Sequence, residues 1–260
     1  MASTDSGCSS YYLNRELSQL EFARRVLAMA ESRDVPILER LRYLSITSSI
    51  LDEFFEVRVA GLKQQAAYGS VQREADNLSA DEQLIKIAES ARRLVADLYR
   101  VLNDDLAPAM SFEGIRLLRP NEWTEAQAAW LKRFFSRDVA PIISPMGLDP
   151  AHPFPEPVNK SLAFIVTLEG RDAFGRNSGR AIVQAPRSLP RVICLPDEVS
   201  EGRCDLVLLA TVIRHFVSDL LLGMKATGCN QFRVTRNSDL FVDDLDSALN
   251  LLCYEQVETV

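Results

Sequence analysis

Histidine and cysteine are scarce and scattered in this chain of 260 residues. The two histidines are His152 and His215, so a zinc site or a histidine-based catalytic triad has little to build on. No CxxC spacing occurs, and an odd, dispersed set of cysteines predicts reduced thiols and neither a disulfide framework nor a metal site. The phosphate and nucleophile motifs GxxxxGKS/T, GxGxxG and GxSxG are also absent. The cysteines are Cys8, Cys194, Cys204, Cys229 and Cys253.

Long apolar runs are missing as well. None reaches the ~20 residues that a membrane-spanning helix needs, and glycine (11) and proline (12) exclude collagen-like and low-complexity chains. Residues 1–10 hold no basic segment followed by an apolar stretch, so we expect no secretory signal and a cytoplasmic protein. With 47% hydrophobic and 25% charged residues, the composition predicts one or two globular domains.

The net charge of −7 is distributed unevenly along the chain. Residues 1–106 carry 13 basic and 17 acidic side chains, residues 107–242 carry 16 and 14, and residues 243–260 carry none and 5. The middle segment is therefore the one that repels a polyanion least, although a charge run is usually a solvated surface.

Apolar residues at spacings of three and four predict that the first third of the chain is helical. Ser18 and Glu21 have the spacing of a capping box, which predicts a helix start there. Pro36 suits the first position of a second helix. Ser49 with Asp52 could begin a further helix, because the serines and threonine before it are poor in a helix interior.

A strongly amphipathic stretch completes the helical part. Ser79 and Glu82 again have capping-box spacing, and the apolar stripe that follows runs to about Leu106. Pro108 is expected to mark its end. The prediction is an N-terminal bundle of three antiparallel helices over residues 11–107.

After Gly114 the pattern changes to short β-branched or aromatic runs bounded by Gly, Pro or Asn, which predict strands. Thr124 with Gln127 predicts a helix that runs to about Val139, and Asp205 is expected to open another. These elements predict an α+β protein whose helical bundle precedes a mixed α/β head domain, placed at 112–244, with a divergent tail at 245–260. The predicted strands are 115–118, 162–168, 180–185, 192–195 and 231–235.

The two histidines and one charged group are candidates for chemistry. His152 lies in a proline-rich segment, Pro141–Pro157, which we expect to be a stiff irregular loop; it could be a base or a phosphate contact, or simply bonded to backbone. His215 lies on an amphipathic helix beside Phe216, which favours a structural role. A second group surrounds two phenylalanines and is either an ion pair that frames a core or a site: Asp52, Glu53 and Arg58.

Two arginines flank Thr235 in the run from Phe232 to Asp239. Arg233 and Arg236 could grip phosphate oxygens in a bidentate way. Pairing of either arginine with Asp239 or Asp243 would look identical in the sequence, so both interpretations stay open.

Two segments resemble the polyphosphate kinases that work through a histidine. The first comprises Tyr12-Leu13-Asn14-Arg15-Glu16-Leu17-Ser18, Leu20-Glu21-Phe22, Arg25-Val26-Leu27 and Leu51-Asp52-Glu53-Phe54-Phe55, and is similar to the N-terminal domain. The second resembles the head domain and comprises Ile143-Ser144-Pro145-Met146-Gly147-Leu148-Asp149-Pro150-Ala151-His152-Pro153-Phe154-Pro155, Val212-Ile213-Arg214-His215-Phe216 and Gln231-Phe232-Arg233-Val234-Thr235-Arg236-Asn237-Ser238-Asp239.

The resemblance implies reversible transfer of the γ-phosphate of ATP to polyphosphate through a phosphohistidine, with Mg²⁺ as cofactor. It implies ATP and polyphosphate as partners, a homo-oligomer and no nucleic acid. The family's phosphorylated histidine and magnesium-binding arginines lie in two C-terminal domains without a counterpart here. Neither histidine is therefore assigned the catalytic role, no metal ligand is assigned, and we expect the chain alone to be inactive.

The resemblance also implies a nucleotide contact and shows where the chain departs from the family. Tyr43 corresponds to an aromatic position that packs near adenine. Ile50 replaces an asparagine whose amide contacts the nucleotide, and an unmade hydrogen bond to a buried base costs about 1–3 kcal/mol. Gln19 replaces a tryptophan, which should loosen packing at the first helix. After Asp244 the sequence no longer aligns, as in a truncated or frame-shifted product.

A second interpretation makes the chain a non-catalytic module that holds polyphosphate or a partner subunit. Its arginines would provide the contacts, and binding would depend strongly on salt because a linear polyanion releases counterions. A non-functional gene product is the third interpretation. The candidate contacts are Arg187, Arg191, Arg233 and Arg236.

Overall fold

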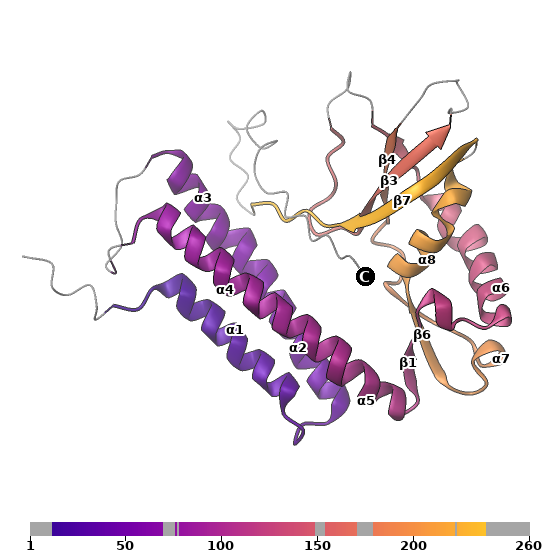
Figure 1. Cartoon of the computed structure of the whole chain (residues 1–260), viewed down its shortest axis with the longest axis horizontal. Coiled ribbons are helices and arrows are strands. Elements are labelled where there is room, and N and C mark those ends of the chain that lie inside the picture. The colour runs from indigo at the N-terminus through magenta and orange to yellow at the C-terminus, as the bar shows by residue number, and fades with distance from the viewer. Residues whose placement is uncertain are drawn as a thin grey trace, which may run out of the picture. The chain divides into compact units, whose positions relative to one another are not determined.

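The computed structural model describes residues 12–69, 76, 78–148, 154–170, 179–221 and 223–237. Two compact units divide between Met110 and Ser111. The first is helical and the second holds both sheets, which confirms the predicted α+β class (Figure 1). Among the described residues, no helix combines the length and the apolar character that crossing a membrane requires.

Three long helices build the first unit. One is α1 by itself, and the other two are each interrupted by one π-helical stretch. Their buried stripes, which include Leu27, Phe54 and Leu94, form a single core. In chain order the elements are α1 (Arg15–Glu31), α2 (Ile37–Glu53), η2 (Phe54–Val59), α3 (Ala60–Ala67), α4 (Ala80–Arg100), η3 (Val101–Leu106) and α5 (Ala107–Phe112).

Buried Arg40, which is only 5% exposed, fixes the directions of these helices. Its Nε donates to the carbonyl oxygen of Ala30 at 2.7 Å, near the end of α1, and its Nη2 pairs with Asp105 in η3. The start of α2 therefore lies beside the ends of α1 and of the third helix. Arg24 in α1 pairs with Asp97 in α4 at 2.9 Å, so α1 and α4 are parallel and α2 runs against both. The predicted three-helix bundle is confirmed, with helices that are consecutive in the chain running antiparallel.

Two predicted helix starts in this unit are wrong. Asn14 caps α1 because its side chain accepts from the backbone N–H of Leu17 at 2.9 Å, and Ser18 lies one turn inside the helix. Ser49 does not begin a new helix either. Its hydroxyl donates to the carbonyl oxygen of Ser45 at 3.1 Å, so it is accommodated within a continuous α2. The capping box at Ser79 is confirmed, with both reciprocal bonds present.

Pro108 does not end the third long helix, as had been expected, but lies inside α5. The turns before it, η3, are π-helical, and the N–H of Ala107 bonds to the carbonyl of Leu102, five residues back. This wider turn displaces the carbonyls that the proline ring would otherwise strike. The helix therefore continues to Phe112.

Two small sheets form the second unit. The strand order is β1-β6-β5 in the first, with β1 parallel to β6, and β2-β4-β3-β7 in the second, which is antiparallel throughout. The strands are β1 (Ile115–Leu117), β2 (Met146–Gly147), β3 (Ala163–Gly170), β4 (Arg180–Gln184), β5 (Val192–Cys194), β6 (Cys204–Leu208) and β7 (Met224–Phe232).

One core serves both sheets and the helices of this unit. Phe135, Phe164 and Ile213 are fully buried in it. The helices are α6 (Glu125–Phe134) with its π-helical extension η5 (Phe135–Val139), α7 (Asp197–Ser200) and α8 (Leu209–Phe216). The capping box of Thr124 and Gln127 is confirmed at the start of α6, and the helix reaches Val139 as predicted.

Three expectations about this unit need correction. Asp205 lies in β6 and does not open a helix; α8 begins at Leu209. The last strand was placed at 231–235 but runs from Met224 to Phe232, because it pairs with β3 along its length. The proline-rich segment is not wholly irregular. It contains a 3-10 turn at Ala140–Ile142 and the short strand β2.

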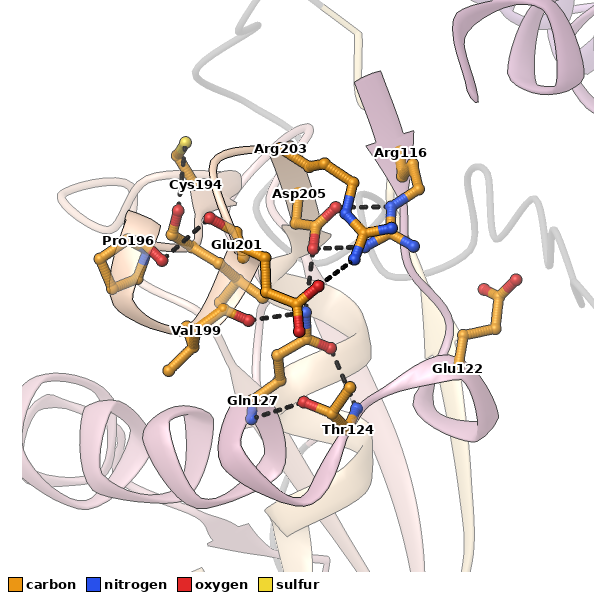
Figure 2. A network of polar contacts seen from close by, with 12 residues as sticks. Arg116, Glu122, Thr124, Gln127, Cys194, Pro196, Val199, Glu201, Arg203 and Asp205 are labelled. Atoms are coloured by element: carbon orange, nitrogen blue, oxygen red, sulfur yellow. Dashed lines mark hydrogen bonds and ion pairs between the residues drawn. The ribbon is translucent and has the colours of Figure 1, made fainter. Parts of the chain in front are cut away.

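Asp205 is completely buried and joins β6 to β1 and α6 (Figure 2). Its carboxylate accepts two hydrogen bonds from Arg116, at 2.7 and 2.6 Å, and one from Nε2 of Gln127 at 2.9 Å. The same Nε2 also donates to the carbonyl of Val199 at 3.2 Å. The bonds to Asp205 raise the pKa of Arg116. This network positions the three-stranded sheet.

Replacing Asp205 with alanine should destabilise the second unit by about 3 kcal/mol, because Arg116 and Gln127 lose their shared acceptor. Thermal or urea unfolding measures the loss. The control is Arg203→Ala, which breaks an exposed pair with Glu201 and should change stability by about 0.5 kcal/mol or less. Equal losses in the two variants would contradict the role of the buried network.

Candidate functional site

Three segments meet at one end of the four-stranded sheet. Ala163, the first residue of β3, lies opposite both Gln184, the last residue of β4, and Phe232, the last residue of β7. Because neighbouring strands are antiparallel, the chain entering β3 and the chain leaving β4 and β7 lie together at this end. We call this place the basic end, after the residues Lys160, Arg187, Arg191 and Arg233 that these segments carry.

Backbone and side-chain hydrogen bonds hold the three segments together. The N–H of Lys160 donates to the carbonyl of Val234 at 2.8 Å, and the N–H of Ala185 donates to the carbonyl of Leu162 at 2.9 Å. The Arg187 guanidinium donates to the carbonyl oxygen of Asn159. The first bond extends contact beyond β7, the second extends the β3–β4 pairing, and the third adds a side-chain link between two segments.

The basic end carries more positive than negative charge. Segments 154–162, 185–191 and 233–235 contain a single acidic residue, Glu156, against the four basic ones. Burial lowers the pKa of Arg191, and repulsion from Arg187 lowers it further. The two guanidinium groups are therefore held close enough to repel each other, and an anion bound between them would relieve that repulsion.

The structure brings together most of the arginines singled out in the sequence. Arg187 and Arg191 are exposed neighbours, and Arg233 is half-buried at the same end of the sheet. Arg233 directly follows Phe232, the last residue of β7. Arg236 is grouped with the first unit. Its proposed acidic partners, Asp239 and Asp243, lie outside the described residues.

Sequence reasoning did not single out Lys160. It is one of two described residues other than glycine with a positive φ, at 55°, and this conformation turns its N–H toward Val234. A lysine carries no sequence signal for a left-handed conformation. The Asn159-Lys160 pair was the only available hint of a turn.

The predicted nucleotide contact, Tyr43, lies on α2 in the helical unit. Ile50 is seven residues further along, on the same face, and both side chains are half-buried against the bundle core. Thr47 lies between them and uses its hydroxyl within the helix, donating to the carbonyl of Tyr43 at 2.9 Å. This face offers a partly exposed aromatic ring, and Ile50 supplies no amide.

The other candidates for chemistry show structural surroundings. The ring centroid of His215 lies 4.9 Å from that of Trp123 and 4.7 Å from that of Phe216, and both pairs are edge-on. His152 lies outside the described residues. Beside Asp52, Glu53 and Arg58, the two phenylalanines at the start of η2 pack edge-on at 5.7 Å, and Phe54 is buried in the core. No group of three or more His, Cys, Asp or Glu side chains with metal-binding geometry occurs within the described residues.

Comparison with known families and proteins gives consistent matches along the chain. Residues 12–118 match the polyphosphate kinase N-terminal domain, and residues 126–258 match the polyphosphate kinase middle domain. The polyphosphate kinase of Pseudomonas aeruginosa is 51% identical over 238 residues, which cover 92% of this chain and 34% of that protein. The polyphosphate kinase of Neisseria meningitidis is 50% identical over 234 residues, which cover 90% of this chain and 34% of that protein.

A solved structure gives the same result. The crystal structure of polyphosphate kinase from Porphyromonas gingivalis superposes with a TM-score of 0.76 at 27% identity. The match covers 91% of this chain and 34% of that one. The chain therefore spans about a third of the length of the relatives that it matches.

The left-handed conformation of Lys160 should determine how substitutions at this position change the free energy of unfolding. Lys160→Val should lower the free energy of unfolding by about 1 kcal/mol, and Lys160→Gly should leave it unchanged or raise it, because only glycine adopts a positive φ without cost. Lys225, exposed in β7, is the control, and the order should reverse there because valine suits a strand and glycine does not. The same order at both positions in urea unfolding would contradict this account of the turn.

Proposed function

The chain belongs to the polyphosphate kinase family, and from this membership we propose that it contributes to reversible transfer of the γ-phosphate of ATP onto polyphosphate. Its helical unit would supply one wall of the nucleotide pocket through Tyr43. Its second unit would bind polyphosphate through the basic end. The family's Mg²⁺ would act at a centre to which neither unit is assigned a ligand.

The observation that carries the polyphosphate part is the placement of like charges. Arg187 and Arg191 repel each other at the basic end, and Lys160 and Arg233 lie on the neighbouring segments. A chain of phosphate groups presents closely spaced negative oxygens that several guanidinium and ammonium groups bind at once. The exposed position of both arginines leaves them accessible to a long polymer.

The phosphoryl-transfer centre is not assigned to these residues. His215 is packed against aromatic rings, and His152 has no acidic partner at a suggestive spacing. Phosphoryl transfer depends on positioned charges and a nucleophile that act together on the phosphate. We therefore propose that the chain by itself binds its substrates without transferring phosphate, and that Ile50 weakens its hold on the nucleotide.

Polyphosphate binding should weaken when the paired arginines lose their charge. The Arg187→Gln, Arg191→Gln double variant should bind polyphosphate about tenfold or more weakly. The slope of log K against log salt should fall in magnitude by about 1.4, by analogy with single-stranded polyanions. Titration with a labelled chain of defined length at several salt concentrations measures both quantities.

Arg92→Gln is the matched control, because Arg92 is an exposed arginine on α4 in the helical unit. It should leave both affinity and slope close to those of the unaltered chain. A loss in this control as large as in the double variant, or polyphosphate affinity that salt does not change, would contradict the proposed site.

The purified chain incubated with γ-labelled ATP and Mg²⁺ should acquire no acid-labile label and make no polyphosphate. The physical reason is that His215 is packed against aromatic rings and no phosphoryl-transfer centre is assigned to these residues. A full-length relative assayed in parallel confirms that the conditions support turnover. Label on His152 or His215, located by peptide mapping, would overturn the proposal for phosphoryl transfer and leave that for binding in place.

A further inference from the structure

Strands β5 and β6 bring two cysteines onto one face of the three-stranded sheet. Cys194 is the last residue of β5 and lies opposite Leu206. Cys204 is the first residue of β6, two positions before Leu206, so its side chain is on the same face. Residues related in this way are diagonal neighbours across an antiparallel pair.

Both thiols are exposed. The Cys194 thiol also approaches the carbonyl oxygen of Leu195, with the sulfur 3.8 Å from that oxygen (Figure 2). Partial desolvation of the Cys204 side chain, the neighbouring Cys194 and the charge of Asp205 raise the pKa of Cys204. The remaining described cysteine, Cys229, is half-buried on β7, and burial raises its pKa to about 11. Exposure therefore separates this pair from Cys229.

A bond between the two sulfurs requires the backbone around the pair to move. Diagonal neighbours have Cα atoms about 7–8 Å apart, whereas a disulfide needs about 4.4–6.8 Å. Each cysteine is the terminal residue of its strand, although the backbone pairing continues to Leu195 and Asp205, whose N–H and carbonyl are 2.9 Å apart. The turn between them contains α7, Glu201 with φ 55° and Gly202 with φ 76°. A turn of this kind at the surface adjusts more easily than the middle of a sheet.

We propose that Cys194 and Cys204 form a redox-sensitive modification site at which a thiol oxidant makes one intramolecular disulfide. With a diazene oxidant, one thiolate adds to nitrogen and forms a sulfur–nitrogen bond. The second thiolate attacks that sulfur, the sulfur–sulfur bond forms and the sulfur–nitrogen bond breaks. The two thiols lose two electrons and two protons, and the diazene leaves as the hydrazine that has gained them.

The disulfide would close the turn that carries Val199, whose carbonyl accepts a hydrogen bond from Gln127. It would therefore join the edge strand β5 covalently to the central strand β6, next to the buried carboxylate of Asp205. The expected consequence is a more rigid β5–β6 pair with the rest of the unit unchanged.

The test treats the folded chain with one equivalent of diamide at pH 8 and maps the disulfides by mass spectrometry without reduction. We expect a peptide pair joined through Cys194 and Cys204, and maleimide labelling of these two thiols reduced about tenfold or more. Cys229→Ser should leave this product unchanged, whereas Cys194→Ser and Cys204→Ser should each abolish it.

A second measurement keeps the result independent of any variant. The same treatment of the chain unfolded in urea gives the distribution of disulfides that proximity in sequence alone produces. Enrichment of the Cys194–Cys204 product in the folded chain supports the proposal. Equal yields in the folded and unfolded chain, or predominant pairing with Cys8, Cys229 or Cys253, would overturn it.

Discussion

The double pairing of β3 is the constraint on which the proposed site depends. Because Ala163 lies opposite the last residues of both β4 and β7, segments more than 20 residues apart in the sequence must emerge at the same edge. Strand pairing thereby places Lys160 and Arg233 at the same end as Arg187 and Arg191, where burial and repulsion from Arg187 lower the pKa of Arg191. Fold and electrostatics are linked at this point, since a shift in strand register would move Arg233 away from Arg187 and Arg191.

Local signals in the sequence predicted helix starts well where the capping side chain and its partner are neighbours. Ser79 and Thr124 are examples, because each begins its helix with a capping box whose second member lies three residues further along the chain. Ser18 has the same spacing by coincidence, and Asn14 outcompetes it for the helix start. Asp205 was expected to open a helix because it precedes an amphipathic apolar stretch, but it lies in β6. Its partner Arg116 is 89 residues away, and only the fold shows that a buried strand position can hold a carboxylate.

The sequence predicted which arginines belong to the candidate site, but it did not predict that they lie together. Arg187, Arg191 and Arg233 were recognised as possible polyanion contacts, but the sequence could not show that strand pairing would gather them. Lys160 was missed because its left-handed conformation is imposed by the turn and has no counterpart in composition or periodicity. The π-helical stretches were missed too, since η2 has the same apolar spacing as an ordinary helix.

The central claim is that polyphosphate binds at the basic end, and chemical protection tests it most directly. The chain is treated with an arginine-selective dicarbonyl reagent, with and without polyphosphate, and modification is measured at each arginine by peptide mapping. The account predicts that polyphosphate slows modification of Arg187 and Arg191 while exposed Arg92 reacts as before. Protection that is equal at all three arginines, or absent at the first two, would contradict it.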